Sequence, residues 1–304
     1  MSTHQHNHAE HTHTHAPVQF GKAFAIATLL NALFVVLQVL YAYLANSTSL
    51  LADAIHNLGD VLGLAMAWGA NILLSKHPTI RQSYGMKKTS ILASLANGIL
   101  LVFSCGIIAT EAIYKLFAPE IVNAIPVMIV CAIGIVINGG TAMLFMRGQK
   151  DLNIRLAYLH LVYDAVISVS VLLSAGLLYF THWTWLDPLM GLIIACVIIK
   201  GTWFLFMDSL HLLIDAVPKH ISLTAVHTFL TEQSGVKQVH DLHIWALSTR
   251  ENALSVHVWM PDLIWTDAQR QQIVHHLKEK FDIHHSTIQI ERSLEYCEDK
   301  CLIS

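Results

Sequence analysis

Residues 89–117 read TSILASLANGILLVFSCGIIATEAIYKLF, an apolar run whose only charged side chains lie near its end. The run is longer than the ~20 residues that an α-helix needs to cross about 30 Å of hydrocarbon. Five further apolar runs meet the same criterion and lie at 20–44, 49–74, 121–146, 156–180 and 183–207. We therefore predict an α-helical membrane protein with six transmembrane helices.

The composition agrees with a membrane protein and excludes several other classes. Of 304 residues, 54% are hydrophobic and only 13% charged, too few to cover a water-soluble globule. A net charge of -3 offers no basic surface for nucleic acid. Five scattered cysteines form no disulfide framework. Twenty histidines are unusual, and because imidazole ligates zinc, copper and nickel, they point to metal chemistry.

The chain divides into three parts. Residues 1–19 form a histidine-rich tail without the features of a cleaved signal peptide, 20–208 the six-helix domain, and 209–304 a small domain. The tail is expected to concentrate cytosolic metal weakly, the alternative being a tolerated disordered segment. The small domain shows helical or alternating patterns in the order helix, strand, strand, helix, strand, at 222–233, 236–247, 254–260, 267–281 and 286–291. We predict a cytosolic α+β domain of ferredoxin-like type.

Basic residues predict the orientation, because Lys and Arg in short loops stay on the cytoplasmic side. Almost all of them lie before the first predicted span or in the loops that join the second span to the third and the fourth to the fifth. Lys115, at the end of the third span, is the exception. The set comprises Lys22, Lys76, Arg81, Lys87, Lys88, Arg147, Lys150 and Arg155. We therefore expect a multi-pass protein of the inner (plasma) membrane with both termini in the cytosol.

Titratable residues inside spans are costly and usually functional. In the second span His56 and Asp60 are four residues apart and share a helical face, and His160 and Asp164 repeat this spacing in the fifth. One such pair is as well explained by a hydrogen bond between helices, but two identical pairs favour a shared metal site. Asp53, one turn before His56, is expected either to orient a ligand or to line the ion path.

These four side chains suit zinc, which accepts tetrahedral nitrogen and oxygen ligands. Zn²⁺, two ionised aspartates and two neutral histidines sum to zero charge, which lowers the cost of holding the ion in a medium of low dielectric constant. Protonation of both histidines makes the empty site neutral too, so exchange of zinc for protons follows. Polar residues elsewhere in the spans, Asn31, Gln38, Asn97 and Asn138, are expected to form packing hydrogen bonds.

Residues 47–63, the HxxxD pair of the fifth span and the run VHDLHIW at 239–245 resemble the cation diffusion facilitator family, in its zinc exporters of ZitB and ZnT type. The resemblance covers nearly the whole chain. It implies a homodimer, joined through both domains, that exchanges cytosolic zinc for protons by alternating access at a transport site of two histidines and two aspartates. Some relatives carry a second site in the loop between spans two and three. Met86, Lys87 and Lys88 stand there, so we expect that site to be absent.

The same resemblance implies a regulatory zinc site in the cytosolic domain, formed by His240, His257 and Glu291, with His243 as an alternative ligand or a surface residue. Cys297 and Cys301 form a CxxxC pair that either captures zinc or has no metal role, since relatives often have closer spacing.

Family resemblance alone places Lys88 and Asp215 together, as a pair that holds the dimer or couples the two domains. Two other functions remain open: a membrane metalloenzyme, and a metal sensor without flux. An enzyme is not expected, because no span contains HExxH and a site of four protein ligands leaves no open position for catalytic water.

Overall fold

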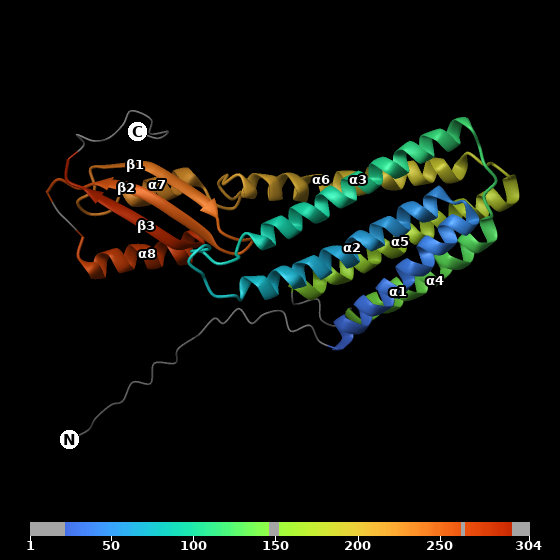
Figure 1. Cartoon of the computed structure of the whole chain (residues 1–304), viewed down its shortest axis with the longest axis horizontal. Helices are drawn as coiled ribbons and strands as arrows, with labels where there is room; N and C mark the ends of the chain where they lie inside the picture. Colours follow the sequence, from blue (N-terminus) through green and yellow to red (C-terminus); the bar gives the residue numbers. More distant parts are fainter. Residues whose placement is uncertain (1–21, 146–151, 263–264, 294–304) are drawn as a thin grey trace, which may run out of the picture.

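A computed structural model describes residues 22–145, 152–262 and 265–293. The predicted tail, Arg147, Lys150, Cys297 and Cys301 lie outside these residues. A bundle of long helices is joined to a small domain of helices and strands, which confirms the predicted fold class (Figure 1). The bundle consists of α1 (Lys22–Ala45), α2 (Thr48–Leu74), α3 (Thr89–Phe117), α4 (Ala124–Phe145), α5 (Leu152–Thr181) and α6 (Leu186–Leu213).

Helices α2 to α6 are each long and apolar enough to cross a membrane, judged over the described residues. Helix α1 has 24 residues, and its apolar stretch with described side chains, Leu29–Ala45, is shorter. Helix α6 continues to Leu213, past the end of its predicted apolar run at 207. Outward-facing apolar side chains, such as Phe103, Val136 and Phe204, are exposed as expected of surfaces that contact lipid.

Helices α3 and α6 run side by side, and α1, α2, α4 and α5 form the rest of the bundle (Figure 1). Two glycines of α2 let α3 approach its backbone closely. A Cβ at Gly59 would lie 2.2 Å from Leu101 Cδ2, and one at Gly63 would lie 2.7 Å from Asn97 Nδ2. Helix α2 also packs against α1, α6 and α5.

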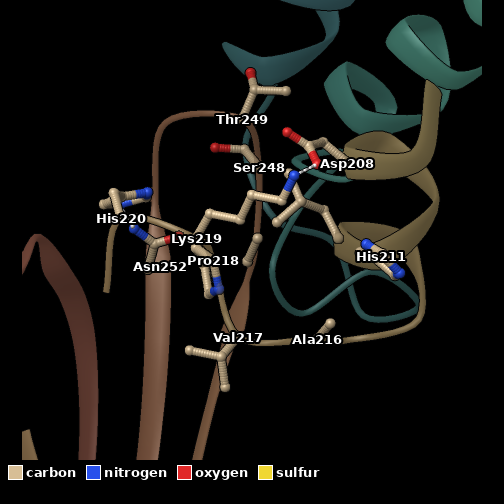
Figure 2. A pocket seen from close by; sticks show the side chains of 12 residues that line it. Asp208, His211, Ala216, Val217, Pro218, Lys219, His220, Ser248, Thr249 and Asn252 are labelled. Atoms are coloured by element: carbon tan, nitrogen blue, oxygen red, sulfur yellow. Dashed lines mark hydrogen bonds and ion pairs between the residues drawn. The ribbon is translucent and has the colours of Figure 1, made fainter. Parts of the chain in front are cut away.

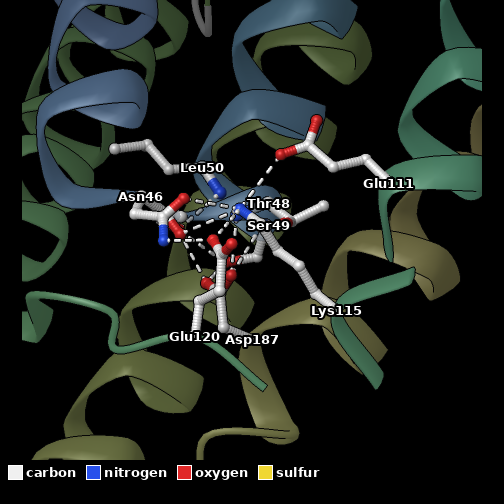
Figure 3. Close-up of polar contacts among 9 residues, drawn as sticks. Asn46, Thr48, Ser49, Leu50, Glu111, Lys115, Glu120 and Asp187 are labelled. Carbon is white, nitrogen blue, oxygen red and sulfur yellow. Dashed lines mark hydrogen bonds and ion pairs between the residues drawn. The ribbon is translucent and has the colours of Figure 1, made fainter. Parts of the chain in front are cut away.

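At the end of the bundle far from the small domain, the start of α2 is fastened to α6 (Figure 3). Asp187 is buried and accepts hydrogen bonds from Ser47 Oγ at 2.6 Å and from the backbone N–H of Thr48, also at 2.6 Å. A carboxylate at a helix N-terminus satisfies N–H groups that have no partner within the helix. Nearby, Lys115 of α3 donates to Asn46 Oδ1 at 2.7 Å. This network fixes the depth of α2 in the bundle.

The small domain contains α7 (Leu223–Thr231), β1 (Gln238–Ala246), β2 (Asn252–Trp259), α8 (Asp267–Phe281) and β3 (Ile283–Glu291). Strand β2 lies in the middle, antiparallel to β1 and parallel to β3. Helix α7 is capped at its N-terminus by Ser222, whose Oγ accepts a hydrogen bond from Ala225 N–H. Side chains of both helices and of the sheet share one core, which includes Leu230, Leu254 and Leu277. The domain therefore holds its strands rigidly in register.

The small domain sits directly against the bundle. A cavity of about 360 Å³ lies where α6 turns into the domain, and an ion pair between Lys219 and Asp208 crosses it (Figure 2). The loop between α2 and α3 also reaches the domain, through an ion pair of Lys87 with Glu251 and a ring contact of Tyr84 with His285. The end of α2 is thus mechanically connected to the sheet.

Candidate metal centre

The two HxxxD pairs meet in the bundle where α2 and α5 pack. His56 Nε2 lies 3.3 Å from Asp164 Oδ1 and 3.7 Å from Asp60 Oδ2. His160 Nε2 lies 3.4 Å from Asp60 Oδ2 and 3.5 Å from Asp164 Oδ2. Each histidine therefore touches the carboxylate of its own helix and that of the other helix.

The members of this cluster differ in accessibility. The side chain of Asp164 is fully buried and that of His56 is 12% exposed, whereas that of His160 is 43% exposed. His56, Asp60 and Asp164 form a group whose ligand atoms all lie within 4.8 Å of one another, and His160 lies at its edge. The arrangement gives a ready set of three ligands and a fourth that is more accessible.

Several buried ligand atoms in this cluster make no well-aligned hydrogen bond, although ion-pair contacts join them. The atoms concerned are both ring nitrogens of His56, Asp60 Oδ2 and both oxygens of Asp164. Unpartnered polar atoms are expensive in a protein interior and rare in the absence of a functional reason. Two carboxylates and two imidazoles at these distances fit a divalent cation that prefers tetrahedral nitrogen and oxygen ligands.

Asp53 lies one turn before His56 on α2, and it is fully buried. Its Oδ2 accepts hydrogen bonds from Gln38 Nε2 at 2.8 Å and from Ser168 Oγ at 3.2 Å. Asn57 in turn donates to Gln38 Oε1 at 2.9 Å. Gln38 does form a hydrogen bond between helices, as expected, but its partner is the carboxylate of Asp53. The participation of Ser168 was not expected, because a serine within a span is a common packing residue.

A second cluster lies on the sheet of the small domain. His240 and His257 are direct partners across β1 and β2, and Glu291 ends β3. Glu291 Oε2 lies 3.0 Å from His240 Nε2, and Oε1 lies 2.9 Å from His257 Nδ1. His240 is buried, and its Nδ1 makes no hydrogen bond. The three ligand atoms lie within 4.8 Å of one another, so the residues fit a zinc ion.

Asp241 also belongs to this cluster, although the sequence pattern did not predict it. Its carboxylate bridges two histidines, with Oδ2 at 3.5 Å from His257 Nε2 and Oδ1 at 2.9 Å from His243 Nε2. A ligating histidine commonly gives its second ring nitrogen to a carboxylate, which fixes the ring. His243 therefore lies one step further out, in contact with Asp241, and is exposed.

Lys88 and Asp215 lie together at the junction of the two domains, with Lys88 Nζ 2.6 Å from Asp215 Oδ1. Both side chains are exposed and belong to the same chain. Their role in coupling or in dimer contact stays a prediction.

Comparison with known proteins identifies the family of both domains. Residues 24–214 match the family profile of the cation efflux transmembrane domain, and residues 218–293 match that of the cation efflux protein cytoplasmic domain. The chain belongs to the cation efflux family. This family consists of transporters and not of enzymes, and the small domain is its cytosolic part.

Several curated relatives are similar over nearly their whole length. A cadmium, cobalt and zinc/H(+)-K(+) antiporter of Bacillus subtilis is 32% identical over 92% of this chain and 91% of its own. The metal cation efflux system protein CzcD of Cupriavidus metallidurans is 32% identical over 93% and 90%. The zinc transporter ZitB of Escherichia coli is 30% identical over 94% and 92%.

Proposed function

We propose that this cation efflux protein exports Zn²⁺ from the cytosol in exchange for protons, by alternating access at a transport site of His56, Asp60, His160 and Asp164. The observation that carries the proposal is the meeting of the four side chains between α2 and α5, with contacts of 3.3 to 3.7 Å. Sites that move an ion across a membrane lie near the middle of the bilayer, where helices of a bundle converge.

Charge balance supports exchange with protons. With both aspartates ionised and both imidazoles neutral, the site with bound Zn²⁺ has no net charge. The site without zinc also has no net charge when each imidazole carries an added proton. Either form avoids the cost of a net charge in hydrocarbon. The site therefore changes access while loaded with zinc or with protons, and resists doing so when it carries a net charge.

The names of the relatives support zinc as cargo and also cadmium and cobalt, because the same nitrogen and oxygen ligands accept several divalent ions. The antiporter name given to the Bacillus subtilis relative supports coupling to protons. Membership of a transporter family argues against a metalloenzyme. A sensor that binds metal without flux is the remaining alternative, and a flux measurement separates it from a transporter.

In the cytosolic domain, His240, His257 and Glu291 are proposed to bind Zn²⁺ as a regulatory ligand. Two such domains are proposed to associate in a homodimer of the plasma membrane, with both termini in the cytosol and with Lys88 and Asp215 helping to couple the domains. The family to which the cytosolic domain belongs and the basic loops at 76–88 support these assignments.

The first test is zinc flux in liposomes across a pH gradient, with the parent, Asp60→Ala and Asp164→Ala. Each substitution leaves one positive charge of the ion uncompensated in a low-dielectric site, so we expect flux to fall by ~100-fold or more. Asp267→Ala, which removes an exposed carboxylate of α8, should transport like the parent. If the parent binds zinc but does not take it up, the result would favour the alternative of a metal sensor without flux.

The second test concerns the electroneutral exchange. Flux should follow the imposed pH gradient, because protons must leave the imidazoles on the cytosolic side before zinc binds. At fixed pH and with equal potassium on both sides, flux should change little when a membrane potential is imposed with a gradient of a permeant anion. A rate that rises steeply with potential would show that net charge moves in each cycle and would contradict the exchange proposed here.

A further inference from the structure

Three contacts between α2 and α5 lie one above another along the bundle. Nearest the cytosolic domain, Asp60 contacts His160 at 3.4 Å, and next His56 contacts Asp164 at 3.3 Å. One turn further toward the opposite end, Ser168 Oγ donates to the carboxylate of Asp53 at 3.2 Å. The positions run 60, 56, 53 down α2 and 160, 164, 168 up α5, as expected of antiparallel helices. The third contact lies outward of the transport site.

The hydrogen bonds around Asp53 have a fixed direction. A carboxylate only accepts, so Gln38 must present its NH₂ group to Asp53 Oδ2. The carbonyl oxygen of Gln38 then faces Asn57, which must present its own NH₂ group. The chain of donors thus runs from Asn57 through Gln38 to Asp53, and it settles the orientation of both amides.

This direction leaves two acceptors without partners. Both residues are fully inaccessible to solvent, and neither Asp53 Oδ1 nor Asn57 Oδ1 makes a hydrogen bond. They are four residues apart on α2 and therefore share a helical face. Buried oxygens that lack donors are the same feature that marks the ligand atoms of the transport site itself. Two carbonyl-type oxygens without donors fit a cation better than they fit each other.

We propose that Asp53 and Asn57 form a second, weaker cation subsite, at which the exported ion stops after it leaves the transport site toward the outer face. The proposal rests on the function proposed above. The ion would be held by Asp53 Oδ1 and Asn57 Oδ1, with water in its remaining positions. Gln38 and Ser168 position the carboxylate by occupying its other oxygen.

The ligand count explains why such a stop helps release. The transport site offers two carboxylates and two imidazoles to a divalent ion, whereas this subsite offers one carboxylate and one amide oxygen. The ion keeps a net positive charge there, so it is held less tightly than in the transport site. Transport needs sites that bind well enough for the ion to arrive and weakly enough for it to leave. A step of lower affinity on the outer side meets both needs.

The test compares zinc flux with zinc affinity in the full chain reconstituted in liposomes, for the parent, Asp53→Asn and Asn57→Leu. We expect flux to fall roughly tenfold in each variant, while the affinity of the transport site stays within about threefold of the parent. That affinity is obtained from the zinc binding that disappears in the double variant Asp60→Ala/Asp164→Ala. Retained binding also shows that the variants are folded.

The double variant Asp53→Asn/Asn57→Asp tests whether the ion needs one carboxylate and one amide at these two positions. Reversal of the Gln38 amide satisfies the same hydrogen bonds in the opposite direction, so the network stays intact and one carboxylate still stands beside one amide. We expect flux within about threefold of the parent. Asn31→Leu is the matched control, because it removes an unpartnered buried amide oxygen that lies on α1, outside this network. This variant should transport like the parent.

Three results would overturn the subsite. Single variants that transport like the parent would show that no ion stops there. Affinity that falls in step with flux would mean that Asp53 only orients the transport ligands. Failure of the swapped variant to transport, although folded, would mean that a carboxylate is needed at position 53 alone. Loss of the proposed function itself would be recognised separately, by unchanged flux in Asp60→Ala.

Discussion

At the scale of single residues, Asp241 shows how a backbone angle shapes a metal cluster. Its φ is 49°, in the left-handed region that few residues other than glycine adopt without cost, and the pairing of β1 with β2 shifts register at this point. The bulge turns the carboxylate toward His257 instead of away from it. Strained residues often occur at functional sites, because the surrounding structure holds them there.

We predict that Asp241→Asn weakens zinc binding by the cytosolic domain roughly tenfold, the usual effect of removing a carboxylate that orients a histidine ligand. Asparagine also tolerates positive φ, so the substitution changes the charge and preserves the backbone. Zinc titration of the full chain measures the effect, with the transport site unchanged. If His243→Ala weakens binding more than Asp241→Asn does, His243 is itself a ligand.

At the scale of elements, the start of α2 depends on its contact with α6. Gly191 of α6 faces Thr48, and a Cβ there would lie 3.1 Å from the backbone carbonyl oxygen of Thr48. Backbone atoms cannot rotate away as a side chain can, so a side chain at position 191 requires the two helices to move apart by a few tenths of an ångström. The hydrogen bonds from α2 to Asp187 depend on the same short distance.

Gly191→Leu should therefore separate α2 from α6 and lower the stability of the protein by about 1–3 kcal/mol, the range measured for overpacked interiors. Thermal unfolding in detergent measures this change, with the loss of monodisperse protein as the signal. Gly201→Leu is the matched control on the same helix, because nothing lies within 4 Å of a Cβ at Gly201. Equal destabilisation by both substitutions would contradict the role given to close approach.

At the scale of the whole molecule, the loop between α2 and α3 links the cytosolic domain to the helix that carries half of the transport site. Lys87 of this loop pairs with Glu251, and at the start of α3 Ser90 Oγ accepts from the backbone N–H of Thr249 at 3.1 Å. Such partly exposed pairs add little to stability. Their effect is to hold two bodies in one relative position.

Charge reversal in Lys87→Glu should loosen this docking, because two carboxylates then face each other. We predict faster hydrogen exchange at the Thr249 amide, by roughly two- to tenfold, with little change in melting temperature. The double variant Lys87→Glu/Glu251→Lys should restore slow exchange. Slow exchange in the single variant would mean that the ion pair does not maintain the contact.

The class of the protein could be predicted from the sequence, since long apolar runs and local periodicity are properties of neighbouring residues. The run at 89–117 became α3 with the same bounds, and the spacing of His56 and Asp60 placed both on one face of α2. The sequence also predicted the order of helices and strands in the cytosolic domain, although strand ends differ by a few residues. Such features depend on contacts within a few residues along the chain.

Which polar side chains share a partner depends on how the helices pack in three dimensions. Gln38 meets Asp53, Asp53 meets Ser168 and Ser47 meets Asp187, across separations of 15, 115 and 140 residues. Periodicity assigns a residue to a face of its own helix, but it does not state which helix lies opposite or at what depth. Packing of whole helices fixes both, and buried oxygens are left with or without donors as a result.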